Sequence, residues 1–340
     1  MHLRLVKGAY WDYEIKHAQV FGYEDYPVYS KKSLTDISFL LCAKEILKNE
    51  KIYAKFATHN AHTISSVHQL GQGKDYEFQR LYGMGELLYQ SAEKVLNLEK
   101  KPSVYAPIGS YKDLLPYLVR RLLENGANSS FINRLLDPET DANWLAENPA
   151  IRIEKEKIDI PLPKNIFTER KNSSGFDLSE NSNLENLEKS ISAHKKNKIN
   201  AESIYVNRDK KEKVGQKVYS IANNEEIGTA IFDDPTNVKS ALENFASEKW
   251  SKYSVQERSQ ILIKISDDIE KDPSELIFYL LNEAGKTIQN AIDEIREAID
   301  FLRYYSRQII EIHGKKSLQG PTGEICLLYT SPSPRDVCSS

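Results

Sequence analysis

Two neighbouring arginines on one helical segment have the arrangement most suited to chemistry in this sequence. Residues 114–125 carry leucines at helical spacing on one side, whereas Tyr117, Arg120, Arg121 and Glu124 share the other face. Adjacent guanidinium groups repel each other unless an anion lies opposite, and their planar fork matches two oxygens of a carboxylate or phosphate. The pattern predicts an anion-binding face, although these residues alone also fit a solvated helix face with an Arg–Glu pair.

A second candidate site follows an early β-type run. Residues 4–11 (RLVKGAYW) hold a basic residue within the run and the small pair Gly8 and Ala9 at its carboxyl end. In a β/α barrel that end faces the active site, and small residues allow a flat ligand to approach the backbone. Tyr10 and Trp11 follow directly and are suited to stacking on such a ligand. An ordinary strand-to-helix turn is the alternative that these residues leave open.

The next β-type run ends in Thr58, His59 and Asn60, at the equivalent end of the expected barrel. These polar side chains fit a ligand site, and they also fit a turn in which Asn60 or Thr58 caps the following helix. We expect no metal there, since no carboxylate or second histidine has the spacing of metal ligands. The EAGKT motif at residues 283–287 matches a phosphate loop only in part, because Leu280 stands where that loop needs glycine. We expect one helix to end and another to begin there.

The elements that position these candidates alternate regularly over the first part of the chain. Each β-type run is followed by a helical pattern, which predicts β/α units around a parallel sheet. Four such units correspond to half of a (β/α)8 barrel or to one side of an open sheet. The expected strands cover residues 3–10, 52–58, 77–82 and 104–108, and the expected helices cover residues 34–49, 61–70, 86–96 and 114–125.

A polar connector at residues 148–200, rich in Lys, Asn, Ser and Glu after its prolines, separates this part from a second, mainly helical part. One helix is expected within it, near residues 184–194. Further β-type runs are expected at residues 203–207 and 217–231.

Helix signals dominate the rest of the second part. Ser254 and Glu257 predict a capping box, and Asp272 predicts an N-cap with Pro273 at the first helical position. Apolar residues at helical spacing predict the buried faces, which are Val238, Ala241, Leu242 and Phe245, then Ile261, Leu262, Ile265 and Ile269, and then Ile292, Ile295, Ile299 and Leu302.

The composition is that of an ordinary globular protein. The 340 residues are 40% hydrophobic and 28% charged, which excludes disorder throughout and suffices for about two domains. The net charge of −3 leaves no excess of positive charge to hold a polyanion, so we expect no nucleic acid partner. Three widely spaced cysteines and the lack of a long apolar run predict a soluble protein of the reducing cytoplasm. Peripheral contact with the inner face of a membrane is left open.

Five motifs, in order, make the first part of the chain resemble the second half of the proline dehydrogenase barrel of the bifunctional proline utilization A family. They are residues 4–19 (RLVKGAYWDYEIKHAQ), 56–63 (FATHNAHT), 78–86 (FQRLYGMGE), 104–109 (VYAPIG) and 117–128 (YLVRRLLENGAN). Residues 283–287 (EAGKT) and 290–305 (NAIDEIREAIDFLRYY) resemble the opening helices of that family's second enzyme, the glutamate semialdehyde dehydrogenase. The resemblance covers roughly residues 3–324.

The resemblance implies an α/β fold in three parts. Residues 1–147 would be the C-terminal half of a (β/α)8 proline dehydrogenase barrel, residues 148–200 a linker, and residues 201–325 the N-terminal helical part of an aldehyde dehydrogenase fold. We expect residues 326–340 to be a non-native tail, because LLYTSPSPRD within them resembles translated adapter sequence.

The family's chemistry then maps onto named residues. The resemblance implies oxidation of L-proline to pyrroline-5-carboxylate with FAD, and of glutamate semialdehyde to L-glutamate with NAD, whose site lies largely outside this chain. It implies that Arg120 and Arg121 clamp the proline carboxylate, and that Tyr10, Leu81, Tyr105 and Tyr117 wall the proline pocket. The residues implied to contact the flavin, its phosphates or its adenosine are Arg4, Val6, Gly8, Ala9, Trp11, Ser30, Thr58, His59, Asn60 and Glu124. We assign no catalytic residue and no metal to the chain.

The sequence also departs from the family. Ser30 stands where a threonine is usual, and Pro116 within the arginine helix predicts a helix start near Asp113. The first barrel strands, with a lysine and an aspartate of the proline site, are absent, as are the catalytic cysteine and glutamate base of the second enzyme. We therefore expect an internal fragment, in which neither Cys326 nor Cys338 has the catalytic context.

Several interpretations of function stay open. Half a barrel exposes two sheet edges, so the chain by itself is expected not to hold flavin, and an inactive fragment or a helical assembly module is the alternative. A monofunctional proline dehydrogenase would leave residues 202–324 unexplained. For the full-length protein the resemblance implies a homo-oligomer, and a quinone or other membrane acceptor is left open.

Overall fold

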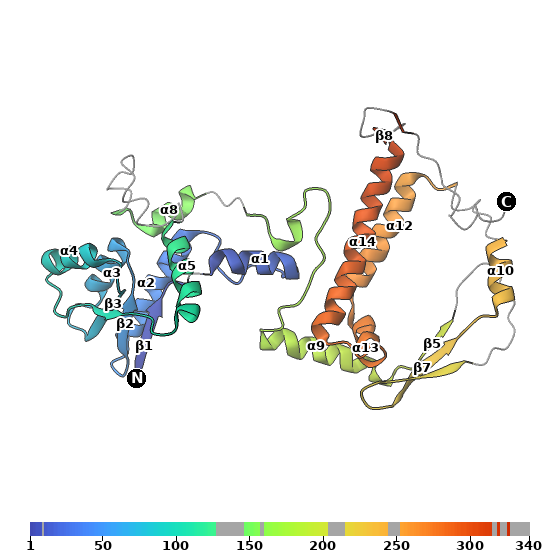
Figure 1. The fold of residues 1–340 in the computed structure, drawn as a ribbon, viewed down its shortest axis with the longest axis horizontal. Coiled ribbons are helices and arrows are strands. Elements are labelled where there is room, and N and C mark those ends of the chain that lie inside the picture. Colours follow the sequence, from blue (N-terminus) through green and yellow to red (C-terminus); the bar gives the residue numbers. More distant parts are fainter. Residues whose placement is uncertain are drawn as a thin grey trace. The chain divides into compact units, whose positions relative to one another are not determined.

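The computed structural model describes residues 1–8, 10–126, 146–156, 160–202, 215–243, 252–314, 318–319 and 325–326. The chain divides into two compact units (Figure 1). Unit 1 comprises Met1–Lys16 and Tyr26–Ile160, and unit 2 comprises His17–Asp25 and Pro161–Ser340.

Unit 1 contains a parallel sheet in the order β1-β2-β3-β4, which confirms the predicted β/α units. Each strand is followed by at least one helix, as a parallel connection requires. The strands are β1 (His2–Val6), β2 (Tyr53–Ala57), β3 (Tyr76–Leu81) and β4 (Ser103–Tyr105), and the helices are α2 (Lys32–Lys48), α3 (Ala61–Leu70), α4 (Glu86–Leu96), α5 (Tyr111–Gly126) and α8 (Pro149–Lys155). Helix α1 (Trp11–Phe21) begins in unit 1, and its residues from His17 onward are assigned to unit 2.

One face of this sheet forms the core of unit 1. Phe56 and Phe78 are buried there with residues of α2, α3 and α4, such as Phe39, Val67 and Tyr89. Successive side chains of a strand point to opposite faces, so the alternate residues of the same strands line the other face. That second face is polar and carries Arg4, Lys55, Glu77 and Gln79.

Helix α5 begins at Tyr111, two residues before the predicted start, and Pro116 lies inside it. The carbonyl of Ser110 accepts hydrogen bonds from the backbone amides of Asp113 and Leu114, at 3.1 and 3.0 Å. The Ser110 hydroxyl also donates to Asp113 Oδ2 at 2.8 Å. These contacts fix the first turn of α5 ahead of the proline. The helix tolerates Pro116 because a proline lacks only one backbone amide donor and lies here near the helix start.

Unit 2 is mainly helical, with a small mixed sheet in the order β5-β7-β6. The predicted run at 203–207 lies outside the described residues, whereas the run at 217–231 is a pair of antiparallel strands, β6 and β7. The strands of unit 2 are β5 (Ile199–Glu202), β6 (Gln216–Tyr219), β7 (Glu226–Ile231), β8 (Leu318–Gln319) and β9 (Ile325–Cys326). Its helices are α9 (Asn181–Ala193), α10 (Pro235–Glu243), α12 (Val255–Lys271), α13 (Ser274–Asn282) and α14 (Ile288–Gly314), and 3-10 turns lie at Pro163–Asn165 and His194–Lys196.

The predicted helix signals of unit 2 are mostly confirmed. Ser254 and Glu257 form the reciprocal capping box, and the helix break at 283–287 separates α13 from α14. The predicted cap at Asp272 is wrong by one residue, because α13 begins at Ser274 and its N-cap is Pro273. Asp272 still accepts a hydrogen bond from the backbone amide of Ser274 at 3.1 Å, so its carboxylate satisfies a donor at the helix start.

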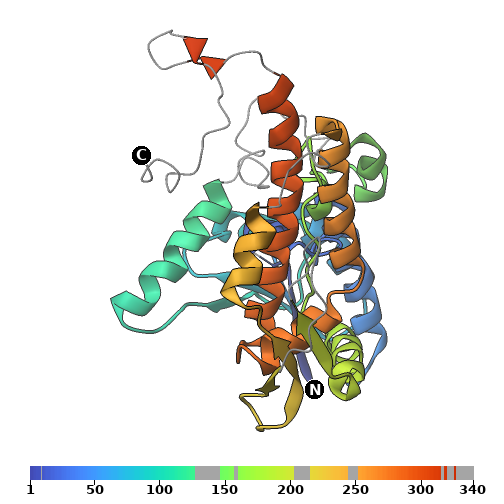
Figure 2. The same cartoon turned by 90° about the vertical axis from the view of Figure 1, so that its right-hand side faces the viewer.

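Helices α12 and α14 lie side by side, as Figures 1 and 2 both show. The residues of α12 that are buried are Ser259 and Ser266, while Ile261 and Ile265 are exposed. Part of the predicted apolar face of α12 therefore lies in solvent. Small side chains at a helix contact let the two backbones approach closely, which is consistent with the long α12–α14 pairing.

Buried charge joins these two helices. Arg303 of α14 is only 4% exposed and donates to Asp267 Oδ1 at 2.8 Å and to Glu270 Oε1 and Oε2 at 3.0 and 2.7 Å. Glu270 also accepts from the backbone amide of Ser174 at 2.8 Å. One guanidinium therefore satisfies two carboxylates, and through Glu270 it holds residue 174 against the helix pair.

A close backbone approach in unit 2 requires glycine. The amide of Gly175 donates to the carbonyl of Gly22 at 2.8 Å, and Gly22 has a φ of +65°. A Cβ at Gly22 would lie 2.1 Å from the carbonyl oxygen of Ser173. Both the positive φ and the contact exclude a larger residue.

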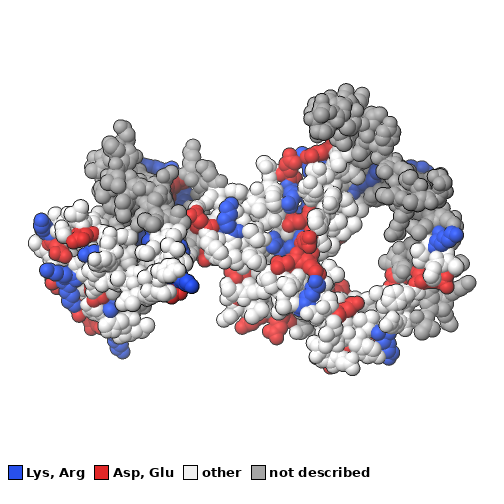
Figure 3. Space-filling view, viewed as in Figure 1, with Lys and Arg blue, Asp and Glu red and all other residues white. Residues whose placement is uncertain are grey.

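Acidic and basic side chains are interspersed on the face of the molecule that Figure 3 shows, without a broad patch of one sign. Among the described residues, no helix combines the length and the hydropathy that a membrane span requires.

Candidate functional site

The carboxyl ends of the four parallel strands of unit 1 bring most of the predicted site residues together. Val6 pairs with Ala57, Ala57 pairs with Gln79, and Leu81 pairs with Tyr105, so the strands end side by side. Residues that follow each strand therefore share one edge of the sheet. This is the edge at which barrel and open α/β enzymes place their sites.

Arg4 connects three of the strands across the polar face. Its Nε donates to Gln79 Oε1 at 2.9 Å, and its guanidinium carbon lies 4.9 Å from the centre of the Tyr105 ring. A residue predicted for the cofactor and one predicted for the substrate pocket are thus in contact. Sequence reasoning missed Gln79, although its place in strand β3, two residues from Glu77, could have put it on the polar face.

The segment after β1 is open. A Cβ at Gly8 would meet no atom within 4 Å, and Ala9 lies outside the described residues. The residues Tyr10 and Trp11 are 52% and 41% exposed. Trp11 is oriented by its Nε1, which donates to the carbonyl of Tyr29 at 3.0 Å and so places the indole beside the segment that holds half-buried Ser30.

An open backbone flanked by exposed rings fits a flat aromatic ligand. Val6, also exposed, adds apolar surface at the same strand end. Exposed apolar groups gathered around a free backbone are typical of a binding surface. The residues predicted to contact a flavin on this side thus include exposed aromatic and apolar groups.

The segment Thr58–Asn60 is held rigidly after β2. The carbonyl of buried Thr58 accepts from the hydroxyl of Tyr89 at 2.8 Å, and its Oγ1 accepts from the amide of Asn60 at 3.2 Å. Asn60 Oδ1 accepts from the amide of Thr63 at 3.0 Å and caps α3, which confirms one of its two predicted uses. Burial raises the pKa of the Tyr89 hydroxyl, so this donor stays protonated. No sequence signal marks Tyr89.

His59 links the end of β2 to the end of β3. Its Nε2 accepts a hydrogen bond from the backbone amide of Leu81 at 3.3 Å. Since a backbone amide only donates, Nε2 must carry the lone pair, and the neutral ring holds its proton on Nδ1. Gly85 packs on the ring, because a Cβ there would lie 2.7 Å from His59 Cδ2. The imidazole thus positions Leu81, which is predicted to wall the proline pocket.

Burial and then the nearby charge of Arg80 lower the pKa of His59 from its usual 6.5. Folding therefore favours the neutral form of the His59 imidazole. Its contribution to the free energy of unfolding is fully present above about pH 6.5 and is lost as the pH falls through the lowered pKa. Unfolding of unit 1 should therefore become easier as the pH falls below about 6.5. Urea titrations of the wild type and of His59→Gln, which keeps an acceptor but does not titrate, should show a smaller loss of stability on acidification in the variant.

His62 is the matched control for this prediction. Burial, followed by the charge of Arg152, also lowers its pKa, but its imidazole makes no hydrogen bond to Leu81. His62→Gln should reduce the acid sensitivity while leaving the Leu81 amide resonance unchanged, whereas His59→Gln should shift that resonance. Equal acid sensitivity of wild type and His59→Gln would contradict the assignment.

The arginine helix faces the end of β1. The guanidinium carbon of Arg120 lies 5.9 Å from the centre of the Tyr10 ring, and that of Arg121 lies 5.3 Å from the centre of the Tyr117 ring. Tyr10 and Arg120, which are far apart in sequence, are thus brought together. The side chain of Glu124 lies outside the described residues.

A half-buried cation, Lys7, supports the same strand end. Lys7 forms an ion pair with Asp36 of α2, donates to Thr63 Oγ1 at 3.0 Å, and lies 5.3 Å from the centre of the Phe39 ring. Sequence reasoning missed this group, because the partners of Lys7 come from two other segments, α2 and α3. These contacts connect Lys7, the residue before Gly8, to α2 and α3, and so they fix the position of the backbone next to Gly8.

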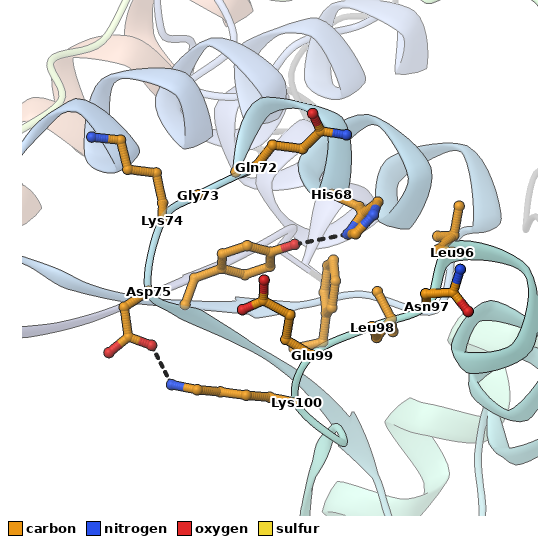
Figure 4. A pocket seen from close by; sticks show the side chains of 13 residues that line it. His68, Gln72, Gly73, Lys74, Asp75, Leu96, Asn97, Leu98, Glu99 and Lys100 are labelled. Carbon is orange, nitrogen blue, oxygen red and sulfur yellow. Dashed lines mark hydrogen bonds and ion pairs between the residues drawn. The ribbon is translucent and has the colours of Figure 1, made fainter.

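A cavity of about 290 Å³ lies elsewhere in unit 1, at the amino ends of β3 and β4 (Figure 4). None of the predicted site residues lines it. Among the described residues, no group of three or more His, Cys, Asp or Glu side chains is arranged to hold a metal ion.

Comparison with known proteins agrees with the two-part organisation. Residues 1–134 match the proline dehydrogenase family, and residues 205–338 match the aldehyde dehydrogenase family. The bifunctional protein PutA of Salmonella typhimurium is 40% identical over 328 residues, which cover 90% of this chain and 25% of that protein. This chain is a PutA-like segment. It spans about a quarter of the length of the relatives that it matches.

Other PutA proteins match the PutA-like chain over both units. PutA of Rhizobium meliloti is 35% identical over 331 residues, covering 94% of the chain and 27% of that protein. The crystal structure of a Bradyrhizobium japonicum proline utilization A variant has a TM-score of 0.77 at 35% identity, covering 95% of the chain and 31% of that structure. The two matched families indicate oxidoreductase chemistry of the flavin and NAD types.

Proposed function

We propose that this chain is part of a bifunctional enzyme of proline catabolism. The first activity would oxidise L-proline to pyrroline-5-carboxylate with FAD, and the second would oxidise glutamate semialdehyde to L-glutamate with NAD. The observation that carries the proposal is the meeting of the Arg120 helix face with Tyr10 at the carboxyl end of β1. This contact places the guanidinium groups of the helix, which could bind a carboxylate, beside an aromatic ring. The open backbone at Gly8, which suits a flavin, lies at the same strand end.

The proposed division of labour follows from residue chemistry. Arg120 and Arg121 would bind the carboxylate of proline, and Tyr10, Leu81, Tyr105 and Tyr117 would surround its apolar ring. Thr58, His59, Asn60, Trp11 and Ser30 would hold the flavin together with Arg4, Val6, Gly8, Ala9 and Glu124. FAD, when bound, supplies the acceptor for the two electrons that leave proline as its C–N bond becomes C=N.

This chain's own residues would orient the substrate and hold a positive charge near the cofactor. The carboxylate clamp fixes the ring carbon that loses hydrogen, because a bidentate arginine contact restricts rotation of the bound amino acid. Arg4 is held by Gln79 at 2.9 Å, so its positive charge stays at one place near the proposed flavin. Fixed charge near the cofactor is how a protein tunes its electronics.

The proposal extends to the setting of the whole protein. We propose that the full-length protein is a cytoplasmic homo-oligomer and that a quinone or another membrane acceptor receives the electrons from proline. The glutamate semialdehyde site, with its NAD, would lie largely outside this chain.

A visible spectrum tests the proposed function. Residues 3–324 would replace the matching segment of the Salmonella typhimurium protein, and the chimaera would be purified and mixed with L-proline. We expect flavin absorbance that bleaches on addition of L-proline and does not bleach with D-proline. A chimaera that folds, by circular dichroism, and binds no flavin would favour the helical assembly module instead.

A further inference from the structure

The cavity at the amino ends of β3 and β4 is built by two turns of unit 1. One turn, at residues 71–75, joins α3 to β3, and the other, at residues 96–100, joins α4 to β4. Left-handed backbone at Gly73 and Asn97 shapes these turns. In β/α barrels the active site lies at the opposite, carboxyl ends of the strands, so this cavity is separate from the candidate site.

The cavity has a firm aromatic wall. The ring of Tyr76 packs so closely on Gly71 that a Cβ there would lie 2.5 Å from Tyr76 Cε1. The Tyr76 hydroxyl is hydrogen-bonded to His68 Nδ1 at 3.2 Å (Figure 4). Phe78, Leu96 and Leu98 add apolar surface to the lining. A small apolar body would find complementary surface here.

The charges of the lining residues sum to zero but are unevenly placed around this wall. Four charged residues line the cavity, and two of them, Asp75 and Lys100, form an ion pair with each other. In Figure 4 Lys74 points away from the cavity, whereas Glu99 points into it. The negative charge of Glu99, after burial, contributes to a raised pKa of Tyr76, which places the carboxylate near that ring. Glu99 is thus the charge that a molecule in the cavity would meet.

We propose that this cavity binds a small organic ammonium ion. The apolar body of the ion would lie on Tyr76 and Leu98, and its N–H groups would donate to the carboxylate of Glu99. A carboxylate and an aromatic face together attract a cation more strongly than either does alone, since each supplies negative potential to the same point. The inference does not rest on the proposed function, because it uses none of the residues of the candidate site.

The test uses pyrrolidinium chloride as the probe and cyclopentanol as a neutral molecule of similar size. Both would be titrated into the ¹⁵N-labelled chain, with the amide resonances of Gly71 and Gly73 as the readout. We expect pyrrolidinium to shift both resonances with a Kd on the order of 1 mM, and cyclopentanol to bind at least about fivefold more weakly. L-proline should also bind more weakly than pyrrolidinium, because Glu99 repels its carboxylate.

Glu99→Gln removes the charge and keeps the shape, and it should weaken pyrrolidinium binding about fivefold or more. Glu50→Gln is the control, since Glu50 is an exposed carboxylate outside the cavity, and it should leave binding unchanged. Unchanged binding in Glu99→Gln, equal binding of cyclopentanol, or shifts confined to other amides would each overturn the proposal. The outcome of this binding test does not depend on whether the chimaera binds flavin.

Discussion

Replacing Arg120 or Arg121 with alanine should lower kcat/KM for L-proline in the chimaera by roughly a hundredfold to a thousandfold. Removing one partner of a desolvated, hydrogen-bonded charge pair costs about 2–5 kcal/mol, and about 1.4 kcal/mol corresponds to a factor of ten in rate. Most of the loss should appear in KM, because the clamp holds the carboxylate in the ground state as well as in the transition state. Steady-state kinetics over a range of proline concentrations measures both effects.

Two controls separate the clamp from general damage to the helix. Lys112→Ala removes an exposed cation from the first turn of α5 and should leave kcat/KM within about twofold. Arg121→Lys keeps the charge but not the planar fork, so it should recover only part of the loss. If Arg120→Ala, Arg121→Ala and Lys112→Ala had equal activity, the carboxylate would have to bind elsewhere.

Replacing Arg303 with leucine should destabilise unit 2 by about 1–3 kcal/mol. The variant keeps the apolar bulk of the side chain but leaves Asp267 and Glu270 without the guanidinium to which they bind at 2.7–3.0 Å. The side chain of Glu270 is only 23% exposed and would lose its charged partner, whereas that of Asp267 is 53% exposed and would be hydrated, so the expected cost is that of one unsatisfied, partly desolvated group. Urea unfolding followed by circular dichroism would measure the change.

Arg307 provides the matched control on the same helix. Its side chain is 42% exposed and contacts Glu169 and Glu311, at 3.1 and 3.3 Å. Arg307→Leu should therefore change the free energy of unfolding by less than about 1 kcal/mol. Equal destabilisation by both substitutions would mean that burial of Arg303 does not matter, and would refute the role given to this network.

The sequence was sufficient wherever a few neighbouring residues decide the structure. The cap of α3 by Asn60, the box of Ser254 with Glu257, and the helix break at Gly285 were all predicted. Each depends on hydrogen bonds or backbone angles within four or five residues, so the local pattern contains the necessary information. The parallel sheet of unit 1 was predicted because its alternating pattern has few other solutions.

Tertiary structure decided the contacts that give the candidate site its chemistry. Arg4 meets Gln79, His59 accepts from Leu81, and Arg120 meets Tyr10 only because the strands and α5 pack in one particular register. The same holds for the buried network of Arg303. These partners lie between about 20 and 110 residues apart in the chain, and hydrophobic periodicity specifies which face of an element is buried but not which distant side chain it meets. The residue types were therefore determined by the sequence, and their pairing was determined by packing.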